Sequence, residues 1–246
     1  MRWGIHQDED VCVFWPPLEG TLNCHFSDLF SNDLEVNPPF PDASRFMNAW
    51  RLVVLPDDDI SPGFDRISAN CPVPFNEENT DGRHIDFAYN RIPESLKNIY
   101  RDLFGQLVIL PSLSDRVDAF AQHFNDDTVS VQIRSWPDDP VRHNALFNMD
   151  HIVRELDRLP ADAGIFLSTD TDDVVTFLSS KYPDRVMTCE RSTSRVDSRY
   201  VPMGVQEDLV ELLLLARNRK LIGSSISTFS EVAWWLGGCQ ADVVIV

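Results

Sequence analysis

Three short segments carry side chains that could bind a phosphorylated ligand. Arg134 follows the apolar run VSVQI, the segment STD at 168–170 follows GIFL, and the hydroxyl-rich segment SSISTFS at 224–230 follows LIG. A guanidinium can hold a phosphate through two parallel hydrogen bonds. A hydroxyl-rich loop that leads into a helix can surround an anion with N–H groups and with the positive end of the helix dipole. If the three segments meet in the fold, they would form a binding site for a nucleotide-bearing ligand.

Each segment also has an ordinary structural interpretation. Arg134 could be an exposed or ion-paired surface residue. Asp170 could accept a hydrogen bond from a ribose hydroxyl or a nucleobase, or it could cap the helix that follows it. The serines of 224–230 could likewise be no more than helix caps. Each signal is weak alone, and the three support a binding site because they recur on successive strands.

The elements that must position these segments alternate along the second half of the chain. We expect helices at 114–124, 149–159, 171–181, 206–217 and 231–236, and strands at 129–133, 164–167, 185–188 and 221–222. Strands that alternate with helices of about ten residues are typical of an α/β fold with a doubly wound parallel sheet. Ligands bind such sheets at the carboxyl ends of the strands. This rule selects the three polar segments as neighbours.

The helix expected at 206–217 leads into the strand that precedes the hydroxyl-rich segment. Its acidic residues Glu207, Asp208 and Glu211 are expected in the opening turns. Carboxylates there would suit the positive end of the helix dipole.

Composition and charge exclude several classes of protein. The chain has 246 residues, 43% of them hydrophobic and 24% charged, as in an ordinary soluble globular protein. The net charge of −18 argues against nucleic acid or an anionic membrane as a standing partner. The five cysteines form no CxxC pair, so we expect neither a metal site nor a disulfide framework. With no membrane span or signal peptide expected, the predicted location is the cytoplasm.

The first half of the chain is less regular. Residues 31–95 are rich in proline, and a helical pattern covers 92–103. The strands expected in this half lie at 11–15, 51–55 and 84–89. We place a domain boundary at 110/111, which gives domains of 1–110 and 111–246. Because only ten residues precede the first strand, we expect the first domain, an irregular α/β domain, to be incomplete at its amino terminus.

Three stretches resemble motifs of the GDP-fucose fucosyltransferases, which include bacterial nodulation fucosyltransferases, α-1,6-fucosyltransferases and protein O-fucosyltransferases. They are VSVQIRSW, FLSTDTDDVVTFLSSKYPDRV and VELLLLARNRKLIGSSISTFSEVAWWLGG. The resemblance covers most of 11–238 and is most specific in the second half. It implies a GT-B-like fold, with 1–110 on the acceptor side and a Rossmann-like nucleotide-sugar-binding domain at 111–246. It also implies inverting, metal-independent transfer of fucose from GDP-fucose to a glycan or related acceptor, with no further cofactor.

The resemblance assigns roles to individual residues. Arg134 becomes the catalytic residue, which binds the β-phosphate and stabilises the departing GDP. The substrate-binding positions are Gln132, Asp170, Glu211, Ser227, Thr228, Phe229 and Ser230. The acceptor base is not assigned by the resemblance. Asp138 and Asp139 are candidates by position only, and a solvated turn is the alternative.

Several departures from the family pattern leave a second function open. Gln132 stands where the family has a histidine, and Ser135 stands where many members have a second arginine. The glycine- and asparagine-containing motif of the family's first strand-to-helix turn is also absent. A degenerate nucleotide-sugar-binding protein, or an inactive fragment that keeps the pocket without turnover, is therefore the alternative to an active transferase.

Overall fold

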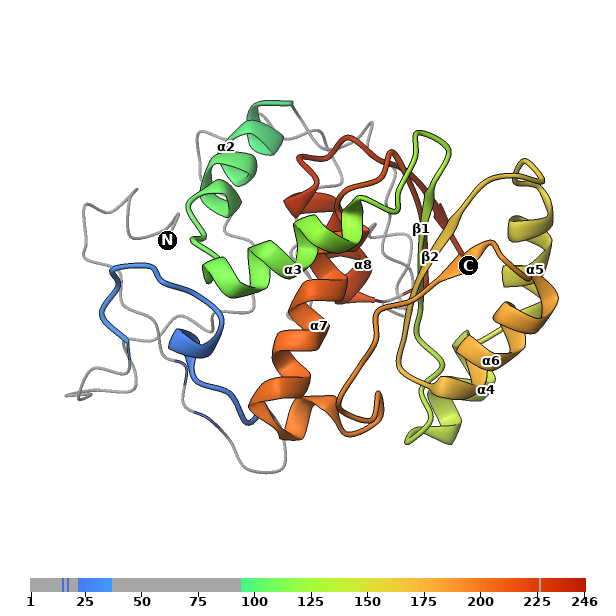
Figure 1. Ribbon diagram of the computed structural model, residues 1–246, viewed down its shortest axis with the longest axis horizontal. Helices are drawn as coiled ribbons and strands as arrows, with labels where there is room; N and C mark the ends of the chain where they lie inside the picture. Colours follow the sequence, from blue (N-terminus) through green and yellow to red (C-terminus); the bar gives the residue numbers. More distant parts are fainter. Residues whose placement is uncertain (1–14, 16, 18–21, 37–93, 226) are drawn as a thin grey trace.

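The computed structural model describes residues 15, 17, 22–36, 94–225 and 227–246 (Figure 1). Its centre is a five-stranded, all-parallel sheet in the order β3-β2-β1-β4-β5. The strands are β1 Val129–Ile133, β2 Ile165–Thr169, β3 Val186–Met187, β4 Lys220–Gly223 and β5 Asp242–Ile245. The prediction of an α/β fold with a doubly wound parallel sheet is therefore confirmed.

Helices cover both faces of the sheet (Figure 1). The helices are α2 Glu94–Gly105, α3 Pro111–Ala121, α4 Pro140–Leu146, α5 Met149–Asp157, α6 Asp172–Lys181, α7 Pro202–Leu215 and α8 Thr228–Leu236. Two short 3-10 helices, η1 Phe26–Asp28 and η4 Ser198–Tyr200, complete the described elements. In Figure 1 the helices α4, α5 and α6 lie on one side of the strands, and α3, α7 and α8 lie on the other.

Alternation along the strands sends side chains into two separate cores. On one face, Val131 and Leu167 pack with residues of α5 and α6. On the other face, Phe166 and Leu221 pack with α3, α7 and α8. β1 is buried along its whole length, as expected for a central strand covered on both faces.

Strand register brings the ends of β1, β2 and β4 to one level. Gln132 lies beside Ser168 on one side and beside Gly223 on the other. The residues that follow these strands therefore emerge at the same edge of the sheet. This is the arrangement that the three polar segments were predicted to have.

Helix starts are where the sequence-based prediction was wrong. α3 begins at Pro111 rather than at 114, and α7 begins at Pro202 rather than at 206. Proline suits the first helical position because its φ is already helical and no partner is needed for the missing N–H. α8 begins at Thr228, three residues earlier than expected. Helix α4 and strand β5 were not predicted.

Residues on both sides of the expected domain boundary share one core. Cys24 and Leu29 belong to the same cluster as Leu214 and Trp235. The ring of Tyr100 in α2 lies 5.3 Å from that of Trp235 in α8. The division at 110/111 stays a prediction. The expected strands at 51–55 and 84–89, and all of the strand at 11–15 except its last residue, lie outside the described residues.

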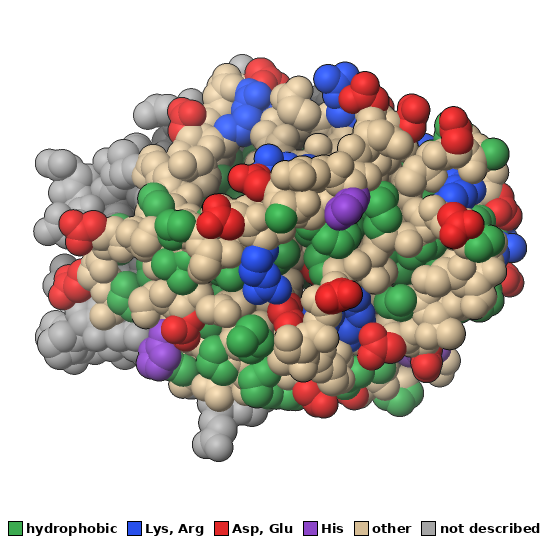
Figure 2. Space-filling view, in the orientation of Figure 1, with side chains coloured by type: hydrophobic (Ala, Val, Ile, Leu, Met, Phe, Trp, Pro, Cys, Tyr) green, Lys and Arg blue, Asp and Glu red, His purple; other side chains and the backbone are tan. Residues whose placement is uncertain are grey.

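The outer surface is consistent with the composition. On the face seen in Figure 2, basic side chains are scattered among acidic ones and do not form a continuous basic patch. No helix in the described part of the chain is long and apolar enough to cross a membrane.

Gly204 provides a test of how tightly α7 packs on η4. A Cβ at Gly204 would lie 2.5 Å from Cα of Ser198 and closer still to its carbonyl oxygen. Backbone atoms cannot move aside as a side chain can, so we expect Gly204→Ala to lower the free energy of unfolding by about 1–3 kcal/mol. Urea unfolding measures this change.

Gly105→Ala is the matched control for this substitution. Gly105 ends α2, and a Cβ there would meet no atom within 4 Å. The control should change stability by no more than about 1 kcal/mol. Equal effects of the two substitutions would contradict the packing described for η4.

Candidate functional site

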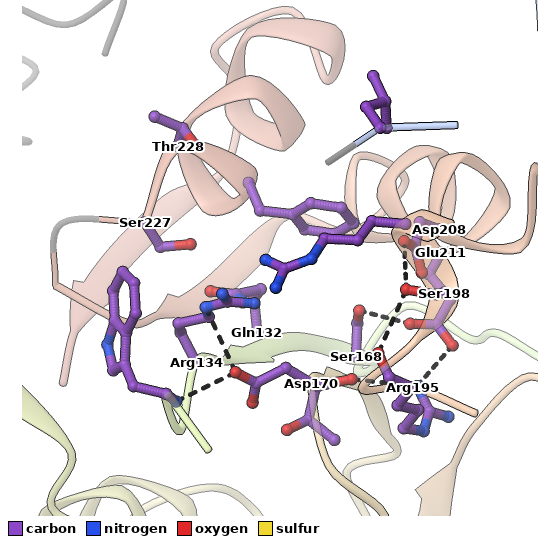
Figure 3. A pocket seen from close by; sticks show the side chains of 15 residues that line it. Gln132, Arg134, Ser168, Asp170, Arg195, Ser198, Asp208, Glu211, Ser227 and Thr228 are labelled. Carbon is purple, nitrogen blue, oxygen red and sulfur yellow. Dashed lines mark hydrogen bonds and ion pairs between the residues drawn. The ribbon is translucent and has the colours of Figure 1, made fainter. Parts of the chain in front are cut away.

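A cavity of about 520 Å³ lies where the carboxyl ends of β1, β2 and β4 meet α7 and η4 (Figure 3). β1 and β4 are neighbours in the sheet, and the strand order reverses between them, since β2 and β3 continue on one side and β5 on the other. Open parallel sheets bind their ligands in the crevice at this reversal. The cavity is therefore in the place where this fold class puts a binding site.

Arg134 lies at the mouth of this cavity. Its backbone N–H donates to Oγ of Ser224, 2.8 Å away, which joins the loop after β1 to the loop after β4. Its Nε lies 3.3 Å from Oδ2 of Asp170, and its guanidinium carbon lies 4.8 Å from the ring centre of Trp136. The side chain is still 36% exposed. Arg134 is thus ion-paired, as one interpretation held, and it also lines the cavity.

Asp170 holds the loop that carries Arg134. It accepts hydrogen bonds from the N–H and hydroxyl of Ser135 at 2.8 and 2.7 Å, and from the N–H of Trp136 at 3.1 Å. It does not cap α6, because the N-cap residue of that helix is Thr171. These contacts give Asp170 a positioning role, which neither sequence-based interpretation included. Direct binding of substrate by Asp170 stays a prediction.

Trp136 adopts an unusual backbone conformation in the same loop. Its φ is 55°, in the left-handed region that bulky residues rarely occupy. Two guanidinium groups contact its ring. The guanidinium carbon of Arg142 lies 4.9 Å from the ring centre, in addition to that of Arg134. Nε1 of Trp136 is buried and has no hydrogen-bond partner among the described residues. Strained residues of this kind are concentrated at functional sites.

The hydroxyl-rich segment is both a helix cap and a wall of the cavity. Oγ of Ser227 accepts from the N–H of Ser230, so the capping interpretation is correct for Ser227. The N–H groups of Thr228 and Phe229, in the first turn of α8, have no partner within a helix. Ser227, Thr228 and Phe229 all line the cavity. The helix therefore presents its amino terminus to the cavity.

Gln132 is tied to the same helix. Its Oε1 accepts from the hydroxyl of Ser230 at 2.7 Å, and both residues are buried. This contact leaves the amide nitrogen of Gln132, a donor, for a ligand in the cavity that it lines. Ser230 is the one predicted substrate-binding residue that does not line the cavity.

Glu211 belongs to a buried ion-pair network. It accepts from the hydroxyl of Ser168 at 2.6 Å and from Arg195 at 2.8 Å, and a terminal nitrogen of Arg191 lies 3.2 Å away. Asp208 accepts from Arg191 at 2.7 Å and from the hydroxyl of Ser198 at 2.8 Å. Glu211 lines the cavity, but its charge is compensated within the protein. Its contact with a substrate stays a prediction.

The helix-dipole explanation for these carboxylates was wrong. Because α7 begins at Pro202, Glu207, Asp208 and Glu211 lie in the body of the helix and not in its opening turn. Glu207 and Glu211 are buried, and their partners are arginines and the backbone of the segment that precedes η4. Local ion pairing therefore accounts for the acidic residues.

Glu207 anchors this segment most firmly. It accepts from the N–H of Ser192 at 2.6 Å and from the hydroxyl of Thr193 at 2.5 Å. Burial alone would raise the pKa of Glu207, but these hydrogen bonds and the charge of Arg191 outweigh it and hold the pKa below its ordinary value of 4.5. For Arg191, burial likewise opposes the charge, yet Glu211 and Asp208 raise its pKa.

One segment that lines the cavity was not predicted from the sequence. Arg195, Ser198 and Arg199 line it from η4 and the residues before it. The sequence ERSTSRVDSR does contain a signal, because its arginines recur every four residues. No strand or helix was expected in this segment, so no prediction placed its arginines near the edge of the sheet where the strands end.

The two candidates for an acceptor base differ in their surroundings. Asp139 caps α4 by accepting from the N–H of Arg142 at 3.0 Å. The side chain of Asp138 is 64% exposed. Both line a second, smaller hollow of about 290 Å³ that shares Arg134 with the main cavity.

None of the described cysteines lines the cavity. Burial raises the pKa of the Cys24, Cys189 and Cys239 thiols to about 12, so these three are not thiolates at neutral pH. In the part of the chain that the structure describes, no three His, Cys, Asp or Glu side chains come together as a metal site.

The pKa of Glu207 yields a prediction about acid stability. A carboxylate whose pKa is lowered in the folded state contributes stability above its unfolded pKa and loses it as the pH falls through its folded pKa. We expect Glu207→Gln to lower the free energy of unfolding at pH 7 by about 1–3 kcal/mol. The difference from the parent should shrink as the pH falls below 4.5.

Denaturant unfolding between pH 7 and pH 3 measures this difference. Glu190→Gln, which changes an exposed carboxylate of the same segment, is the control and should leave the pH profile unchanged. A constant difference between Glu207→Gln and the parent over the whole range would rule out the carboxylate as the titrating group.

Comparison with known proteins gives partial structural similarities. No family model and no curated protein matches the sequence. NodZ α-1,6-fucosyltransferase soaked with GDP-fucose is 23% identical, with a TM-score of 0.44 over 59% of this chain and 48% of that chain. Fucosyltransferase NodZ from Bradyrhizobium is also 23% identical, with a TM-score of 0.42 over 58% of this chain and 47% of that chain.

A plant protein is similar over a comparable part of the chain. A mutant of Arabidopsis thaliana FUT1 in complex with GDP is 18% identical, with a TM-score of 0.43 over 65% of this chain and 38% of that chain. The chain thus spans about half the length, or less, of the solved proteins named here. The NodZ structures are fucosyltransferases, which is the superfamily that the sequence motifs resemble.

Proposed function

We propose that the cavity binds a nucleoside diphosphate-sugar and that the chain transfers its sugar, with GDP-fucose as the donor and a glycan as the acceptor. One observation carries the proposal: Arg134 and the amino terminus of α8 line the same cavity at the reversal between β1 and β4. A cation and a helix amino terminus together are what a diphosphate requires. The choice of GDP-fucose rests on the motifs around Arg134, Asp170 and Ser227–Ser230.

Arg134 has N–H donors available for a phosphate. Only Nε is paired with Asp170, so the two terminal nitrogens remain for a bidentate contact. Stacking on Trp136 and the hydrogen bonds of Asp170 to the loop fix the direction of the side chain. Such preorganised donors are the main source of electrostatic stabilisation in enzymes.

In the proposed reaction, the bond between the sugar C1 and the β-phosphate oxygen breaks. Its electron pair stays on that oxygen, so the leaving GDP gains negative charge, and the acceptor oxygen forms the new bond to C1 from the opposite side. The acceptor hydroxyl gives up its proton to Asp138 or to solvent. Arg134 and the N–H groups of α8 stabilise the departing diphosphate, the role that a metal ion has in other transferases.

The acceptor would enter through the smaller hollow. Trp136 and Asp138 line it, and Arg134 is common to both hollows. This arrangement would set an acceptor hydroxyl beside the donor diphosphate.

The cytoplasm is the location we propose, in keeping with the free thiols of Cys24, Cys189 and Cys239.

A second candidate function is nucleotide-sugar binding without turnover. The observation that favours it is Ser135, which occupies the place of a family arginine and is buried against Asp170. Ser135 cannot stabilise a leaving group from there. Release of free fucose from GDP-fucose would establish the transferase, whereas GDP-fucose binding with no release or transfer would establish the alternative.

Arg134→Ala tests the catalytic assignment. Charge on the leaving phosphate grows in the transition state, so we expect turnover to fall by about 10²–10³ and GDP affinity to fall less. Arg134→Lys should recover little, because an ammonium keeps the charge but loses the two parallel hydrogen bonds. GDP-fucose turnover and calorimetric titration with GDP provide both numbers.

The control must be an arginine away from the cavity. Arg142 stacks on the same Trp136 ring as Arg134 and is unsuitable. Arg217, which is exposed and paired with Asp118, is suitable, and Arg217→Ala should match the parent. If Arg134→Ala also matches the parent in turnover and affinity, the catalytic assignment fails.

Binding of GDP should not depend on a metal ion. The described residues offer no cluster of metal ligands near the cavity, so we expect GDP to raise the melting temperature equally with and without EDTA. Thermal unfolding followed by circular dichroism measures the shift. A shift that appears only with Mg²⁺ or Mn²⁺ would contradict the metal-independent mechanism.

A further inference from the structure

Three arginines line the cavity, and their surroundings divide them into two kinds. Arg195 is buried, with only 4% of its side chain exposed. It donates to Glu211 at 2.8 Å and to the carbonyl oxygen of Thr169 at 3.2 Å, and its Nε lies 3.2 Å from Asp172. Its charge is therefore used within the protein. Arg134 and Arg199 are the exposed pair, and they line both the main cavity and the smaller hollow.

The charge of Arg199 is only weakly compensated. Its side chain is 46% exposed, and its nearest carboxylate is that of Asp138, at 3.9 Å. It donates to the hydroxyl of Tyr200 at 2.6 Å and stacks over that ring at 4.8 Å. A hydroxyl does not neutralise a guanidinium. Arg199 can therefore bind an anion without first losing a strong ion pair.

Three contacts hold the backbone at Ser198 and Arg199. Ser198 donates its hydroxyl to Asp208 at 2.8 Å, and Gly204 allows the first turn of α7 to lie directly against Ser198. On the other side, the N–H of Asn23 donates to the carbonyl oxygen of Arg199 at 2.9 Å. A fixed backbone lowers the entropy cost of holding an exposed guanidinium against an anionic ligand.

Arg199 reaches the cavity from a different loop than Arg134. Figure 3 shows Arg134 and Ser198, the residue before Arg199, on opposite sides of the cavity. The contact of Arg199 with Asp138 joins this side to the loop after β1. A diphosphate between the two loops would meet one guanidinium from each.

We infer that Arg199 is a second phosphate-binding residue, which holds the diphosphate of the donor from the side opposite Arg134. The inference rests on the proposed function, and it names how the site acquires a second cation although Ser135 carries none. With Arg199 in this role, the site has two exposed arginines, Arg134 and Arg199, to balance the two negative charges of the donor's diphosphate. The alternative is that Arg199 only stacks on Tyr200 at the surface.

Titration of GDP and guanosine against Arg199→Ala separates these alternatives. Guanosine carries the base and ribose without phosphate. We expect Arg199→Ala to weaken GDP binding by roughly 10- to 100-fold, as for loss of a charged hydrogen bond, and to leave guanosine within about two-fold of the parent. Arg199→Lys should fall between the two, because it keeps the charge and loses the planar fork. Arg217→Ala is the control and should bind both ligands as the parent does.

Three other outcomes would overturn the inference in distinguishable ways. If Arg199→Ala binds GDP within about two-fold of the parent, Arg199 is a surface residue, and the proposed function stands through Arg134. If GDP and guanosine weaken equally, Arg199 supports the base, the ribose or the fold rather than the phosphates. If the parent itself binds no GDP, the proposed function and the inference fail together.

Discussion

The pairing of Glu211 with Arg195 is the interaction on which the site depends. A buried carboxylate is tolerated only when charge and hydrogen bonds compensate it. Arg195 supplies the charge and simultaneously binds the carbonyl oxygen of Thr169 and the carboxylate of Asp172. The pair therefore connects α7 to the end of β2, to α6 and to the segment before η4. Removing either partner would leave a buried charge and release the wall of the cavity.

The buried and exposed arginines around this wall have different functions. Arg191 and Arg195 form ion pairs with carboxylates of α7, namely Glu207, Asp208 and Glu211. These pairs fix the segment before η4, which has no regular secondary structure. Arg134 and Arg199 are the partly exposed arginines of the cavity, and Arg134 also pairs with Asp170. The chain has a net charge of −18, but the charged side chains that line the cavity balance, with Arg134, Arg195 and Arg199 against Asp170, Asp208 and Glu211.

The sheet, and the edge at which the three polar segments meet, could be predicted from the sequence because they follow from local patterns. The run at 129–133 was predicted as a strand, and β1 has those bounds. The starts of α3 and α7 were misplaced because the prolines at 111 and 202 were not recognised as first helical residues. α4 was missed for a related reason, since Pro140 opens a helix in a stretch that is otherwise polar.

Roles that depend on distant partners could not be predicted. Asp170 acts on residues 34 to 36 positions earlier in the chain, and only the register of β1 against β2 brings them together. Arg191 and Arg195 lie outside any strand or helix, and Arg199 lies in the short 3-10 helix η4, which was not predicted. The positions of Arg191 and Arg195 follow from carboxylates on α7, whose burial depends on the whole fold.

The hydrogen bonds from the loop after β1 to Asp170 have a consequence for the rate at which the proposed ligand would bind. These hydrogen bonds fix the backbone around Arg134 before any ligand arrives, so at this loop association requires only the ordering of side chains, at about 0.5–1.5 kcal/mol each. Long-range electrostatics then become the main influence on the encounter. At low ionic strength the field of a strongly acidic chain repels a diphosphate, and added salt screens this repulsion. Association should therefore become faster as salt is added, the reverse of the usual behaviour of a phosphate-binding protein.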